Sequence, residues 1–240
     1  MKVSQWILLA FLVTVSSVSI GASTASWSYE HPKVKSGEFV IHSACMMTAE
    51  GKVSKLGVKG SEGMAKQSDE WSTNLQKLVE LHLKSGGVGL LPAMSGGSSG
   101  ASDDELQQVV LQISQKYDDI ASKLNRKPKD IGKSRFTLGD QVALLPCAAK
   151  SDVLVFVEGE GQVLTGGKKA MGALFGGASA SGATLILTMA DAKTGEILVF
   201  TRLENNSGFS EQFMQDTEKA YGKSLDKQLI KLKIAQKAEK

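Results

Sequence analysis

Three short apolar runs in the C-terminal half constrain the fold of this chain more than any other feature. They are Asp-Val-Leu-Val-Phe-Val at 152–157, Thr-Leu-Ile-Leu-Thr-Met-Ala at 184–190 and Ile-Leu-Val-Phe-Thr-Arg-Leu at 197–203. Such runs are typical of strands that are buried on both faces. The last two flank a turn at 191–196 in which Gly195 suits the left-handed conformation, so they predict an antiparallel hairpin. The chain therefore needs a sheet that is covered on two sides.

The rest of the chain supplies helices and further strands for such a sheet. Strand-like and helix-like patterns alternate in the N-terminal half, which implies right-handed crossovers and parallel pairing. Ser102 and Glu105 form a capping box at the start of one helix. The sequence thus predicts one α/β domain over 38–236, with a mixed sheet of about five strands flanked by helices. The further expected elements are strands at 39–47 and 88–91, helices at 68–85, 102–126, 137–145 and 210–233, a long glycine-containing loop at 48–66 and a flexible linker at 95–101.

The N-terminus has the pattern of a secretory signal. Lys2 precedes an apolar run at 6–15, and small residues follow as far as Ala25. The run is shorter than the roughly 20 residues that cross a bilayer. We therefore expect residues 1–25 to be a signal peptide and the mature protein to be periplasmic or secreted, with an uncleaved anchor as the alternative.

Two polar segments flank the predicted domain. Residues 26–37 lack periodicity and predict an exposed arm, while residues 237–240 form a basic tail.

Export would permit a disulfide between Cys45 and Cys147. Cys45 lies toward the C-terminal end of one predicted strand, and Cys147 lies just before the start of another. If these strands are parallel, the two thiols are at opposite ends of the sheet, too far apart to bond. We therefore expect no bridge.

Composition and spacing exclude several classes of function. The 28 Lys and Arg residues nearly balance 25 Asp and Glu residues, so the net charge of +3 does not predict nucleic-acid binding. Three dispersed histidines lack metal-ligand spacing. The stretch at 161–169 departs from the phosphate-binding loop, because Gly167 stands where a lysine is required. No cofactor is predicted.

Two acidic residues follow the apolar run at 152–157. Glu158 and Glu160 are two apart, so on a strand they share one face at a separation of roughly 7 Å. That separation fits a carboxylate pair for hydrolysis. The alternative is that both lie at the solvated rim of the sheet.

The segment at 161–182 is the other unusual feature, because it joins two strands with small residues and contains no acid. We expect it either to be a contact loop for a partner protein or membrane surface, or to be a hairpin extension that folds back on the sheet. The candidate contact residues are Lys168, Lys169, Met171, Leu174 and Phe175.

The strand and turn residues carry a resemblance to a family of bacterial envelope proteins. The pattern Ala-Ala-Lys-Ser-Asp-Val-Leu-Val-Phe at 148–156, followed by Asp-Ala-Lys-Thr-Gly-Glu-Ile-Leu at 191–198, resembles the superfamily that includes the TolB N-terminal domain, CsgG and LpoB. Asp-Glu-Trp at 69–71 is similar to a motif of uncharacterised envelope lipoproteins. The resemblance implies an envelope location and an α/β fold, and carries no established activity.

These observations lead to one expected function and two alternatives. We expect an exported, non-enzymatic interaction or assembly-accessory protein that binds another envelope component, with its oligomeric state left open. The first alternative is a periplasmic hydrolase that uses Glu158 and Glu160. The second is a small-ligand-binding protein whose site lies near the 48–66 loop.

Overall fold

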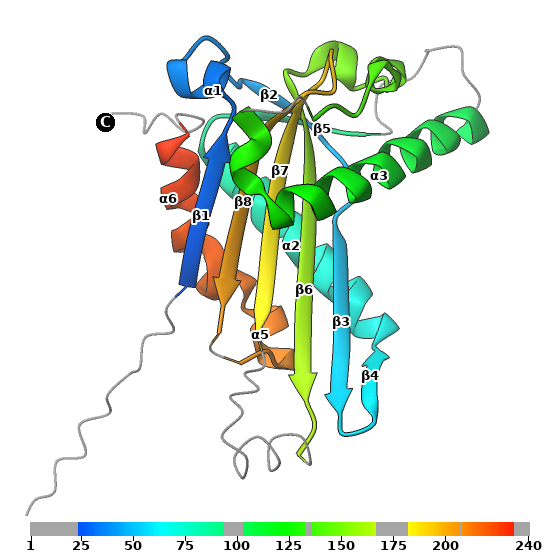
Figure 1. Cartoon of the computed structure of the whole chain (residues 1–240), viewed down its shortest axis with the longest axis vertical. Helices are drawn as coiled ribbons and strands as arrows, with labels where there is room; N and C mark the ends of the chain where they lie inside the picture. The colour runs from blue at the N-terminus through cyan, green and yellow to red at the C-terminus, as the bar shows by residue number, and fades with distance from the viewer. Residues whose placement is uncertain (1–23, 94–102, 133–135, 167–181, 207, 233–240) are drawn as a thin grey trace, which may run out of the picture.

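A mixed sheet of eight strands runs through the molecule and has helices on both faces (Figure 1). The computed structural model describes residues 24–93, 103–132, 136–166, 182–206 and 208–232. The predicted α/β class with a mixed, helix-flanked sheet is confirmed, although the sheet has eight strands and not about five. The strands are β1 (Thr24–Glu30), β2 (Ser43–Met46), β3 (Glu50–Gly57), β4 (Gly60–Gly63), β5 (Gly89–Pro92), β6 (Val153–Leu164), β7 (Ala183–Asp191) and β8 (Ile197–Asn205).

The strand order divides the sheet into a parallel half and an antiparallel half. The order is β1-β8-β7-β6-β2-β5, and β3 continues along the edge of β6 beyond the end of β2, with β4 outside it. Strands β2 and β3 pair with β6 in parallel, whereas β6, β7, β8 and β1 are antiparallel. The predicted hairpin is present as β7–β8, and Gly195 has a φ of 67° in its turn.

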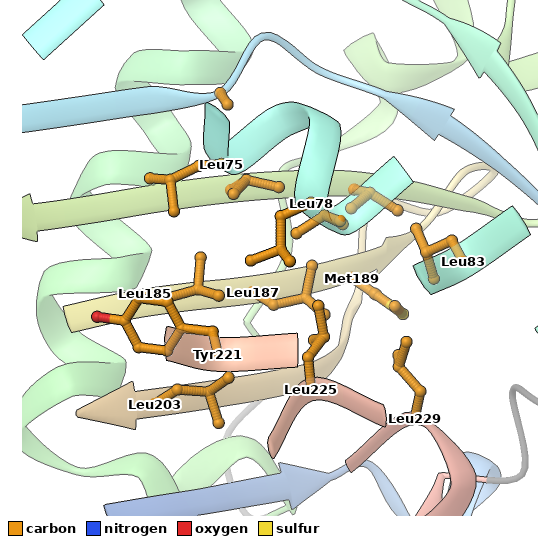
Figure 2. Close-up of a cluster of buried hydrophobic side chains, with 14 of the residues drawn as sticks. Leu75, Leu78, Leu83, Leu185, Leu187, Met189, Leu203, Tyr221, Leu225 and Leu229 are labelled. Atoms are coloured by element: carbon orange, nitrogen blue, oxygen red, sulfur yellow. The ribbon is translucent and has the colours of Figure 1, made fainter. Parts of the chain in front are cut away.

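The back of the sheet is covered by α2 (Ala65–Ser85) and by the C-terminal helices (Figure 1). The C-terminal part begins at Ser210, whose side chain accepts a hydrogen bond from the amide of Phe213 as an N-cap. It comprises α5 (Glu211–Gln215), a π-helical turn (Glu218–Gly222) and α6 (Lys223–Lys231). Figure 2 shows leucines of α2 and α6 packed against inward side chains of the strands, among them Leu75, Leu78, Leu185, Leu187, Leu225 and Leu229.

The front of the sheet is covered by α3 (Asp103–Arg126) and by three 3-10 helices, η1 (Pro128–Gly132), η2 (Asp140–Leu144) and η3 (Ala148–Lys150). Tyr117 of α3 stacks on Phe156 of β6, with ring centroids 4.2 Å apart. In place of the helix predicted at 137–145, the structure has only the short η2. Residues 95–101 and Ser102 lie outside the described residues.

The predicted loop at 48–66 was wrong, because most of it forms the hairpin β3–β4. Its glycines suggested a loop, but Gly51 pairs in register with Gly159 of β6 and both lie against Trp71. A Cβ atom on either glycine would overlap the Trp71 side chain. Ser68 of α2 also contacts this strand, because its hydroxyl accepts a 2.9 Å hydrogen bond from the Val53 amide. Glycine in this strand thus marks the close approach of an indole.

The predicted exposed arm at 26–37 was also wrong. Its first part belongs to β1, which pairs with β8 from Thr24 to Glu30, and its second part is α1 (Pro32–Ser36). Val34 of α1 is buried, and Pro32 stands at the first turn, where its missing amide hydrogen is tolerated. A polar segment can form an edge strand because only one of its faces is buried.

The two cysteines form a disulfide, contrary to the expectation from sequence. Cys45 and Cys147 are bridged with their Cα atoms 5.6 Å apart, and both side chains are fully buried. The expectation failed because Cys147 does not lie in line with β6. The 3-10 helices η2 and η3 lead into β6 over the front of the sheet, so Cys147 packs in the same front core as Cys45 of β2.

Candidate functional site

The predicted contact loop belongs to the part of the chain outside the described residues. Lys168, Lys169, Met171, Leu174 and Phe175 lie outside the described residues, between β6 and β7 in the chain. Their role in partner or membrane contact remains a prediction. Within the described part of the chain, no helix has the length and apolar character needed to span a bilayer.

The two candidate carboxylates lie on the front of β6 but in different surroundings. Glu158 is partly buried beside α3, and Glu160 is exposed opposite Lys52 of β3. Burial raises the pKa of the Glu158 carboxyl above its ordinary value, and this effect outweighs a hydrogen bond from Tyr117. The Oε1 atom of Glu158 is buried and has no hydrogen-bond partner among the described residues. The two members of the predicted pair therefore lie in different environments, one partly buried and one exposed.

Tyr117 and Asp118 of α3 complete the surroundings of Glu158. Tyr117 is buried, and its hydroxyl lies 3.1 Å from the hydroxyl of Thr188 on β7. Burial and the charge of Glu158 raise the pKa of Tyr117 well above its ordinary value. Asp118 and Glu158 line a cleft of about 50 Å³ between α3 and β6. A space of that size holds a few water molecules and no larger substrate.

The histidines do not form a metal site. No group of three or more His, Cys, Asp or Glu side chains in the described residues has the arrangement of a metal centre. His82 is buried in α2, with Nε2 2.8 Å from Glu218 and Nδ1 against Asp226. Burial lowers the pKa of His82, but the two carboxylates raise it above the ordinary value in total. This contact joins α2 to the C-terminal helices and is structural.

An open groove at the β1 edge of the sheet is a second candidate site, which the sequence did not predict. It has a volume of about 640 Å³, within the usual range for binding sites. A strand, a helix and a 3-10 helix supply its walls. The lining residues are Tyr29 and Glu30 of β1, Pro32, Lys35 and Ser36 of α1, and Lys129 and Ile131 of η1.

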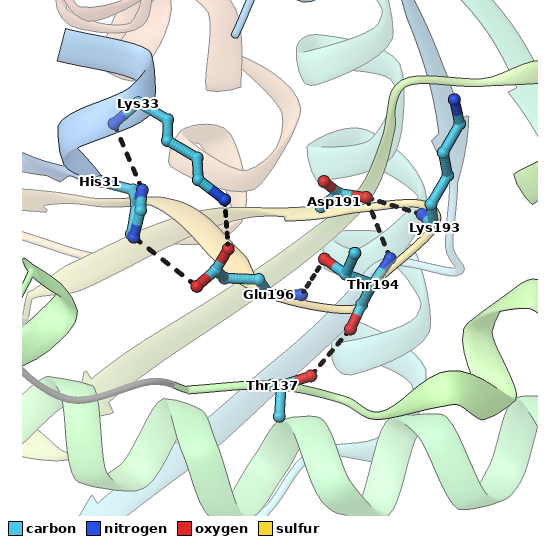
Figure 3. Close-up of polar contacts among 7 residues, drawn as sticks. All are labelled: His31, Lys33, Thr137, Asp191, Lys193, Thr194 and Glu196. Carbon is cyan, nitrogen blue, oxygen red and sulfur yellow. Dashed lines mark hydrogen bonds and ion pairs between the residues drawn. The ribbon is translucent and has the colours of Figure 1, made fainter. Parts of the chain in front are cut away.

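The turn at 191–196 holds the α1 wall of this groove in place (Figure 3). Glu196 accepts a hydrogen bond from Lys33 Nζ at 3.2 Å and lies 3.7 Å from His31 Nε2. Asp191 accepts hydrogen bonds from the amides of Lys193 and Thr194 and so shapes the turn. The turn that carried the family resemblance therefore has a structural role beside the groove.

The groove escaped sequence analysis because its strand was interpreted as an exposed arm. Two signals in the sequence could have indicated it. Trp27 and Tyr29 alternate with polar residues, as in a strand with one buried face, and Pro32 marks the start of a helix. The small-ligand site was expected near a loop at 48–66. Most of that segment forms the β3–β4 hairpin, so the loop that suggested the site is absent there.

Comparisons with known proteins add little to this description. No family model matches the chain, and no curated protein matches it. Two crystal forms of the PelC dodecamer from Paraburkholderia phytofirmans, one of them a point variant, are similar over 89% of this chain and 100% of theirs. Their TM-scores are 0.39 and 0.38, at 6% and 8% identity. Similarity at this level carries no argument about function.

Proposed function

We propose that the protein is an exported, non-enzymatic component of the cell envelope, periplasmic or secreted, that acts by surface contact with another envelope component. The observation that carries the proposal is the buried Cys45–Cys147 disulfide. Disulfides persist in oxidising compartments and are rare in the cytosol. The bridge joins residues that are 102 apart in sequence, so it contributes to the fold as a whole. The signal-like pattern at 1–25 points to the same compartment.

The available surfaces favour contact over catalysis. The groove beside β1 is open and of binding-site size, whereas the cleft beside Glu158 is too small for a substrate. The segment with Lys168, Lys169, Met171, Leu174 and Phe175 is proposed as a further contact region for a partner or a membrane surface.

Fractionation and cross-linking of cells that produce the full chain test this proposal. We expect the mature protein in the periplasmic or extracellular fraction, with both cysteines protected from alkylation until a reductant is added. Photo-cross-linking groups placed on the surface should then give discrete adducts in the native envelope. Recovery only from the cytosol with free thiols, or an envelope without adducts, would contradict it.

The hydrolase alternative has one observation in its favour, the buried Oε1 of Glu158, which has no hydrogen-bond partner among the residues that the structure describes. Burial raises the pKa of Glu158, and a raised carboxyl pKa favours action as a general acid. Replacement of both residues, E158Q/E160Q, separates the two functions. If the protein acts by contact, this variant retains its envelope adducts. If it is a hydrolase, the variant loses activity, and the uncleaved substrate accumulates and can be identified.

A further inference from the structure

The groove beside β1 lies at the outermost strand of the sheet. Tyr29 and Glu30 are consecutive on one strand, so their side chains point to opposite faces, yet both line the groove. Strand β8 pairs with one edge of β1. No strand pairs with the other edge of β1 among the described residues, and the groove opens at the end of β1, next to α1. The backbone amides and carbonyls of such an edge are a template for a further strand.

The chemistry of the groove selects for apolar and acidic groups. Its floor contains Ile131, which is buried, together with the partly buried ring of Tyr29. Lys35 and Lys129 are exposed on its two walls, and neither is in an ion pair within the described part of the chain. Glu30 is the single acid in the lining. The charge of the walls is thus complementary to carboxylates.

We infer that this edge binds an extended acidic segment of a partner protein by strand addition, an inference that rests on the proposed contact function. The backbone of the segment pairs with β1, its apolar side chains contact Tyr29 and Ile131, and its carboxylates meet Lys35 and Lys129. The unpaired backbone favours a peptide over a fatty acid, because a lipid chain offers no amide to pair. A second copy of β1 fits less well, because Thr24–Glu30 carries only one acid.

Synthetic peptides provide the test, measured by fluorescence anisotropy with the full oxidised chain. The probes are a seven-residue peptide of alternating valine and glutamate, the same peptide with lysine for glutamate, and the glutamate peptide with alternate amides N-methylated. We expect the glutamate peptide to bind at least tenfold more tightly than the other two. The variant K35E/K129E should reverse the preference between glutamate and lysine, whereas K66E/K77E, which changes two exposed lysines of α2, should not.

Several outcomes would overturn the inference. They are equal binding of the N-methylated peptide, unchanged preference in K35E/K129E, displacement of the peptide by oleate at equal concentration, or concentration-dependent dimerisation that the peptide inhibits. If these occur while the envelope adducts of the wild-type chain persist in K35E/K129E, the contact function stands and only its location at β1 fails. If the wild-type chain itself forms no adducts in the envelope, the proposed function is refuted.

Discussion

The two faces of strand β6 differ although they belong to the same twelve residues. On the back face, the alternate positions from Val153 to Gly161 are all buried. On the front face, the buried apolar positions up to Phe156 are followed by Glu158, Glu160 and Gln162. The difference reflects what covers each face: α2 packs along β3 and β6 behind the sheet, whereas α3 crosses the front at an angle (Figure 1).

This comparison teaches that the two helical layers depend on different forces. The back layer is held by close packing of large side chains, including Trp71 on the paired glycines Gly51 and Gly159. The front layer is smaller, and the Cys45–Cys147 bridge ties its 3-10 helices to the sheet. Four predictions test this distinction.

Removal of the disulfide should have the largest effect. The variant C45A/C147A should lower the free energy of unfolding by about 4 kcal/mol in urea denaturation, because the bridge closes a loop of 102 residues in the unfolded chain. Wild-type protein kept in a reductant is the matched control and should lose a similar amount. An unchanged midpoint in both samples would mean that the front layer packs as securely as the back.

Overfilling the back face should rank second. In Gly159→Val, the new side chain would meet Leu75 Cδ1 and Trp71 Nε1, so we expect a loss of about 3 kcal/mol from overpacking. The neighbouring front-face variant Glu160→Val is the control and should change stability by no more than about 0.5 kcal/mol. Thermal unfolding of both variants measures the contrast, and similar melting temperatures would remove the distinction between the faces.

The contact of His82 with Glu218 and Asp226 should make the back layer sensitive to pH. Because the folded-state pKa of His82 is raised, its stabilisation is complete below the unfolded value of 6.5 and is lost as the pH rises through the folded value. We expect wild type to exceed His82→Gln by about 1 kcal/mol at pH 5.5, and this margin to shrink by pH 8.5. A constant margin in urea titrations across this range would show that the histidine is uncharged.

The smallest effect should come from Glu158 on the front face. Its raised folded-state pKa means that ionisation disfavours the fold as the pH rises above the unfolded value of 4.5. Glu158→Gln keeps an acceptor for Tyr117 and removes this cost, so we expect a gain of about 0.5 kcal/mol at pH 7 and none at pH 4. A loss of stability at pH 7 would show that the charge of Glu158 is used within the fold.

Local patterns in the sequence predicted the elements whose burial is uniform. Nearby residues were sufficient to predict three elements. These are the buried strand that begins at Val153, the β7–β8 hairpin around Gly195 and the helix that contains Trp71. Strand β3 could not be predicted in this way, because its glycines indicate a loop unless the position of Trp71 is known. The different surroundings of Glu158 and Glu160 likewise depend on where α3 crosses the sheet.

The sequence by itself determined the α/β class, the antiparallel hairpin and the shared face of the two glutamates, because periodicity of apolar residues is a property of neighbouring positions. Only the tertiary structure decided that Cys45 meets Cys147, that residues 24–30 become an edge strand and that a groove opens beside it. Each of these joins segments far apart in the chain. Their contacts depend on how the layers pack, and neighbouring residues in the sequence do not specify that arrangement.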